Sequence, residues 1–88
     1  MAGILTQEQV KEIKELRAKI RALGLEDWMC EGSDVYGPGF ILFNNETDQS
    51  IYCSPFGKIY SSSVDPIPDE LRKLIEYEAR IYRISYVD

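Results

Sequence analysis

A group of hydroxyls, a lysine and a tight turn lie together near the middle of the sequence, in a pattern that can hold a small ligand. Residues 53–63 read Cys-Ser-Pro-Phe-Gly-Lys-Ile-Tyr-Ser-Ser-Ser. Turn amides, the lysine and the serine hydroxyls can hold a phosphate group, while Tyr52 or Tyr60 stacks on a base. This interpretation assigns a nucleotide or phosphate to Ser54, Lys58, Tyr60, Ser61 and Ser62. The alternative is an ordinary hairpin with a polar edge, because Gly57-Lys58 lacks the upstream glycine and the following helix of a Walker A motif.

Other side chains offer little chemistry. The sequence has no histidine, which excludes Ser-His-Asp and Cys-His catalysis within this chain. Cys30 and Cys53 form a poor zinc set without histidine, so we expect free thiols and no metal or cofactor. Glu78 is the one acid predicted within an apolar helix face, where it meets a tyrosine or an arginine or lies at the rim. We therefore expect a protein that is not an enzyme.

The elements around this segment begin with a helix. Thr6 and Gln9 have the spacing of a capping box, and Gly24 is suited to end the helix in the left-handed conformation. Between them runs a narrow apolar stripe, made of Val10, Ile13, Leu16, Ile20 and Leu23. We expect this stripe to pack on the protein's own sheet; the alternative is a homodimer formed through the helix.

The opening of this helix, Leu-Thr-Gln-Glu-Gln-Val at residues 5–10, resembles the start of the first helix in recombinase-type helix-turn-helix domains. The resemblance implies a second helix and then a recognition helix. Acidic loops and predicted strands follow instead, so we do not carry the DNA-binding function over.

Three short strands are predicted next, at residues 40–43, 51–53 and 59–60, after a connection over 26–38. The first is apolar on both faces. Side chains of a strand alternate between the two faces of a sheet. In the second and third strands, one face is predicted to be the core face, with Ile51, Cys53, Ile59 and Ser61. The other face is predicted to display Tyr52 and Tyr60. Ser54-Pro55-Phe56-Gly57 has the pattern of a type I turn.

A second helix is predicted from residues 65–70, where prolines and acids suit a first turn, to about Arg83. The alternative for residues 81–87 is a short fourth strand, because their composition favours strands. The fold class is therefore α+β, in the order helix, three-stranded antiparallel meander, helix. With 88 residues, we expect a single domain over 1–88.

Charge is unevenly distributed along the chain. The net charge is −5, yet residues 25–70 hold nine acids against Lys58 alone, and the helices are mildly basic. Such a surface repels nucleic acid and anionic membranes and favours basic partners. No apolar run reaches membrane-spanning length and the N-terminal residues lack signal-peptide features, so we expect a cytoplasmic protein.

These patterns predict a non-enzymatic module that binds a basic protein surface without direct nucleic-acid or membrane contact. The predicted partner-binding residues are Glu31, Asp34, Tyr36, Glu46, Asp48, Tyr52 and Tyr60. By analogy, small acidic domains of this kind are common among phage-encoded inhibitors of host defence or of nucleic-acid-binding proteins. A ligand-binding protein using the 53–63 hairpin and a structural homo-oligomer are the alternatives.

Overall fold

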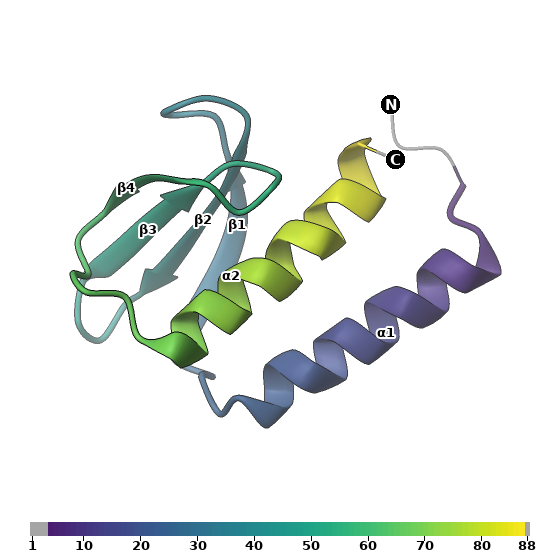
Figure 1. Cartoon of the computed structure of the whole chain (residues 1–88), viewed down its shortest axis with the longest axis horizontal. Helices are drawn as coiled ribbons and strands as arrows, with labels where there is room; N and C mark the ends of the chain where they lie inside the picture. The colour runs from purple at the N-terminus through teal and green to yellow at the C-terminus, as the bar shows by residue number, and fades with distance from the viewer. Residues whose placement is uncertain (1–3, 88) are drawn as a thin grey trace.

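The computed structural model describes residues 4–87. Helix α1 (Gln7–Ala22) is followed by four strands, β1 (Trp28–Ser33), β2 (Gly39–Asn44), β3 (Gln49–Cys53) and β4 (Ile59–Ser62). Helix α2 (Asp69–Tyr82) then continues into a π-helical turn, η1 (Arg83–Val87). The predicted α+β class and element order are confirmed. Figure 1 shows three layers, in which α2 lies between the sheet and α1.

The ends of α1 form as the sequence predicts. The Thr6 hydroxyl accepts a hydrogen bond from the Gln9 amide at 3.1 Å, and the Gln9 side chain accepts one from the Thr6 amide at 2.9 Å. Together they satisfy two backbone donors that a helix start otherwise leaves unpaired. Gly24 follows the helix with φ of 71°, a left-handed conformation that glycine adopts without steric cost.

The sheet is a meander in the order β1-β2-β3-β4, with every neighbouring pair antiparallel. Its fourth strand is β1, which lies within residues 26–38, where the sequence predicts a connection. That prediction was wrong because β1 is an edge strand whose central residues are all exposed, so it lacks the alternating apolar pattern of a covered strand. β1 is held by its pairing with β2.

One face of the sheet, the inner face, packs against α2. Phe40, Leu42, Ile51 and Cys53 point to this side and are buried. α2 contributes the rest of the main core through the residues Leu71, Leu74, Ile75 and Ala79. Burying such apolar side chains supplies the dominant favourable term in folding. The main core therefore lies between the sheet and α2.

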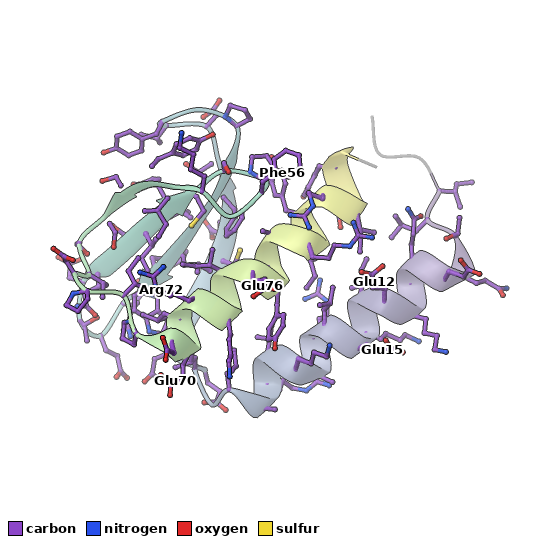
Figure 2. The ribbon with its side chains drawn as sticks, in the orientation of Figure 1. Glu12, Glu15, Phe56, Glu70, Arg72 and Glu76 are labelled. Atoms are coloured by element: carbon purple, nitrogen blue, oxygen red, sulfur yellow. The ribbon has the colours of Figure 1, made fainter. Side chains whose placement is uncertain are left out.

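α1 packs chiefly on α2, and this corrects the expectation that it packs on the sheet. Its one buried residue, Leu16, joins Ile81 and Ile84 in a second apolar cluster, while Ile20 and Leu23 reach the main core. The helices run antiparallel, and Glu12 projects from α1 toward α2 (Figures 1 and 2). There it pairs with Arg80, whose Nε lies 2.7 Å from a carboxylate oxygen. Four residues of the apolar stripe considered as a dimer seam, Ile13, Leu16, Ile20 and Leu23, thus pack within the chain, whereas Val10 is exposed.

The C-terminal segment is helical. α2 ends at Tyr82 and η1 continues to Val87, so the alternative of a strand over residues 81–87 was wrong. Ile84 is buried in the second cluster, and helical geometry places it on the same side as Ile81, three residues earlier. Among residues 4–87, no helix is both long and apolar enough to cross a membrane.

Candidate binding surface

The face of the sheet that points away from α2, here called the outer face, is covered by neither helix. Both helices lie on the opposite side (Figure 1). Strand register places Met29 opposite Phe43, Glu31 opposite Ile41, and Ile41 opposite Tyr52, and directly paired residues share a face. Met29 is 51% exposed, and Ile41, Phe43 and Tyr52 are half-buried. The outer face therefore carries an apolar and aromatic centre open to solvent.

The predicted tyrosines gather at one end of this face. The rings of Tyr36 and Tyr52 meet edge to face with centroids 4.8 Å apart, although Tyr36 remains 54% exposed. The Tyr60 hydroxyl donates a hydrogen bond to the Pro38 carbonyl at 2.9 Å. A side chain at Gly37 would meet that hydroxyl at 3.2 Å, so the loop passes closely over Tyr60. The tyrosines thus hold the β1–β2 loop against the sheet, and Asp34 lies in the same loop.

The predicted acids do not form one cluster. Glu31 lies on the outer face and Asp34 at its tyrosine end, but Glu46 and Asp48 belong to the β2–β3 turn at the other end of the strands. The six residues of β2 separate the two ends by roughly 17 Å at the usual rise per residue. Asn44 shapes that distant turn, because its side-chain oxygen accepts from the amides of Glu46 and Thr47. A partner that contacts one compact area of this face therefore reaches Glu31 and Asp34 more readily than Glu46 and Asp48.

The residues predicted to hold a phosphate do not converge on one site. The turn forms as predicted, with the Gly57 amide donating to the Ser54 carbonyl at 3.0 Å. The buried Ser54 hydroxyl accepts from the amides of Phe56 and Lys58, so it stabilises the turn itself. Phe56 is exposed at the tip of this turn (Figure 2). The Arg83 guanidinium lies 5.3 Å from the centroid of the Phe56 ring.

The remaining serines point to different sides. Ser62 pairs with Ile51 on the inner side, and its hydroxyl donates to the Val64 carbonyl. Ser61 pairs with Tyr52, on the face opposite to the one that its parity predicted. The cause is a β-bulge, in which the stretch Ile59–Ser61 of β4 spans one residue more than Tyr52–Cys53 of β3.

A pocket of about 210 Å³ lies beside β1, in a place that sequence reasoning did not identify. Its lining comes from α1, β1, β2, α2 and η1: Arg17, Cys30, Glu31, Gly32, Phe40, Glu78, Ile81, Tyr82, Ser85 and Tyr86. The rings of Tyr82 and Tyr86 are 4.8 Å apart and form an aromatic wall. Glu78, singled out in the sequence as an acid on an apolar helix face, was the one signal for this pocket.

Cys30 and Glu78 meet in this pocket. Although Cys30 as a residue reaches the surface, burial of its thiol raises the thiol pKa, and the charge of Glu78 and a hydrogen bond to it raise it further. The charge of Arg17 lowers the thiol pKa, but this effect is weaker than those that raise it. The thiol is therefore protonated at neutral pH, and a protonated thiol is a weak nucleophile. Among the described residues, no group of three or more histidine, cysteine or acidic side chains is placed to hold a metal ion.

In comparisons with known proteins, no protein family, no curated protein and no solved structure matches the chain.

Proposed function

We propose that the protein is a non-enzymatic binding module that engages a basic protein partner through the outer face of its sheet. The observation that carries the proposal is the open apolar centre of this face, made by Met29, Ile41, Phe43 and Tyr52. Contiguous apolar surface of this kind is costly to leave in water and marks interaction sites in soluble proteins. Neither helix is placed to cover it.

The composition of the face is that of an interface centre. Methionine and aromatic residues are enriched at the centres of protein interfaces, and tyrosine combines a large apolar ring with a polar hydroxyl. Tyr36 extends the patch from the loop by its contact with Tyr52. Glu31 and Asp34 add negative charge to this surface, in a part of the chain with a single lysine. Complementary charge speeds encounter with a basic partner and selects against acidic ones.

Affinity capture with a matched pair of variants tests this proposal. Phe43→Ser combined with Tyr52→Ser changes the outer face, and Lys14→Ser changes an exposed residue of α1 as the control. A partner that uses the face is captured from the source lysate by the wild type and the control. We expect at least about tenfold less of it on the face variant, since truncating central aromatic residues commonly costs 2 kcal/mol or more.

Two further readouts decide the outcome. Circular dichroism of each variant verifies that the sheet is intact. A salt gradient should release the partner early, because exposed charges are screened at high ionic strength. An unchanged set of captured proteins on a folded face variant would contradict the proposal.

A further inference from the structure

β1 is an unprotected edge strand. It pairs only with β2, so its other side presents backbone groups that no strand in residues 4–87 pairs with. Natural edge strands are usually blunted by charged side chains, above all lysine, by proline, by a bulge or by a covering element. The sequence of β1, Trp-Met-Cys-Glu-Gly-Ser, has one charged residue, Glu31, and neither lysine nor proline. Its pairing with β2 has an unbroken register, and its four central residues are exposed. This edge is thus free to accept another extended strand.

The pocket lies next to this edge, on the side of the helices. Cys30 pairs with Leu42 and Gly32 with Phe40, so both face the inner side, where α2 leaves β1 partly uncovered. Both residues line the pocket together with Glu78 and Tyr82 of α2. Side chains of an added strand would alternate between the two faces of the sheet. Every second side chain of that strand would therefore point toward the pocket.

The size and lining of the pocket suit one cationic side chain. Sites for whole small molecules usually measure about 300–1,000 Å³, and this pocket is smaller at about 210 Å³. Glu78 supplies a carboxylate on this side of the sheet and Arg17 an opposing cation, whereas the side chain of Glu31 lies on the outer face. Tyr82 and Tyr86 supply aromatic faces. A guanidinium both stacks on aromatic rings and pairs with a carboxylate through two hydrogen bonds, which an ammonium cannot do. Arginine is thus the best match.

We propose that an extended basic segment of the partner adds to β1 as a fifth strand and inserts an arginine side chain between Glu78 and the Tyr82–Tyr86 wall. Acids flank both ends of this edge, with Glu26 and Asp27 before β1 and Asp34 after it. A second copy of this chain would bring the same acids against each other, and like charges across strands are destabilising. The inference rests on the proposed protein-binding role, but it assigns a different surface.

A defined probe tests the inference without a known partner. The probe is an acetylated and amidated peptide of alternating threonine and valine with one central arginine, and the matched control has citrulline, the uncharged isostere, in its place. Binding is followed by the fluorescence of Trp28, the only tryptophan, at the start of β1. Amide signals of residues 28–33 are followed by nuclear magnetic resonance. We expect these amides to shift and exchange more slowly, and the arginine peptide to bind about tenfold more tightly than the citrulline peptide.

Two pocket variants sharpen this result. Glu78→Gln should reduce the preference for arginine to about twofold or less, whereas Glu76→Gln, on an exposed position of α2 (Figure 2), should leave it unchanged. Arg17→Ala removes the opposing charge and should tighten binding of the arginine peptide by roughly two- to fivefold. Thermal unfolding of Glu78→Gln establishes that it is folded before its affinity is compared.

Three outcomes would overturn the inference: no saturable binding up to about 5 mM peptide, equal affinity for both peptides, or dimers by light scattering that form through β1. The face variant Phe43→Ser with Tyr52→Ser should still bind the peptide, because its changes lie on the other side of the sheet. Loss of lysate capture by the face variant together with no peptide binding by the wild type would overturn this inference alone. Specific binding of the arginine peptide together with unchanged capture by the face variant would contradict the proposed function alone.

Discussion

Consecutive residues of β2 are equally apolar, but they meet two different environments. Phe40 and Leu42 face α2 and are each 1% exposed, whereas Ile41 and Phe43 face outward and keep part of their surface in water. Folding explains the first pair, since one buried face is enough to hold a small antiparallel sheet. It does not explain the second pair, because a solvated face is normally polar. The proposed binding role would account for this excess apolar surface.

The largest expected effect is on stability, where the inner and outer faces of the sheet should differ most. Leu42→Ala should lower the free energy of unfolding by about 2–5 kcal/mol, because it leaves a cavity in a closed core. Phe43→Ala should lower it by less than half as much, since the outer side chain is partly hydrated before unfolding. Urea unfolding followed by Trp28 fluorescence measures both. Equal losses would mean that the outer face is part of the folding core, and the argument for an open binding face would lose its basis.

The parts of this fold that depend on neighbours in sequence were predictable. The Thr6–Gln9 cap, the left-handed Gly24 and the Pro55 turn each depend on residues within four positions of one another, and each forms as predicted. The apolar face of α2 also follows from spacing alone, including Leu71, Leu74, Ile75 and Ile81.

The parts set by distant residues were not predictable. β1 has no pattern of its own and is defined by pairing with β2. The partner of α1 is α2, more than 45 residues further along the chain. The bulge that turns Ser61 outward depends on the register between two strands. The candidate pocket combines five elements, so only Glu78, an acid on an apolar stripe, pointed toward it.

The inner face should also differ from the outer face in its response to alkaline pH. Burial raises the pKa of the Cys53 thiol from 9.0 to about 11. The unfolded chain then loses this proton at a lower pH than the folded protein, so the Cys53 contribution is complete below pH 9 and declines as pH rises toward 11. The loss over this window is on the order of 2–3 kcal/mol.

Cys53→Ala isolates this effect from tyrosines and lysines that titrate in the same range. The variant is expected to be less stable at neutral pH, because it removes a buried side chain, but to lose less stability between pH 9 and 11 than the wild type. Urea midpoints at several pH values give the comparison. Parallel curves for the two proteins would show that the closed inner face does not protect this thiol.

The smallest effect is expected in the outermost layer, where α1 rests on α2. Glu12 and Arg80 form the hydrogen-bonded ion pair between these helices, with Arg80 Nε and Nη2 donating to the two carboxylate oxygens, but both side chains are more than one-third exposed. Partly exposed ion pairs contribute little to stability. Glu12→Gln should therefore lower the Tm by no more than about 4 °C, a small shift for a domain of this size.

The pH dependence of this pair gives an independent check with a definite sign. The hydrogen bond from Arg80 holds the pKa of the Glu12 carboxyl below 4.5, its ordinary value. Its stabilising contribution is therefore present above pH 4.5 and is lost as the pH falls through the lowered value, so the Tm gap between the wild type and Glu12→Gln should narrow on acidification. A gap that is large at neutral pH and unchanged by acid would indicate that Glu12 acts through packing rather than charge. In that case α1 would belong to the same cooperative core as α2 and the inner face of the sheet. The difference in packing between the closed inner face and the open outer face would then be greater than the buried residues alone indicate.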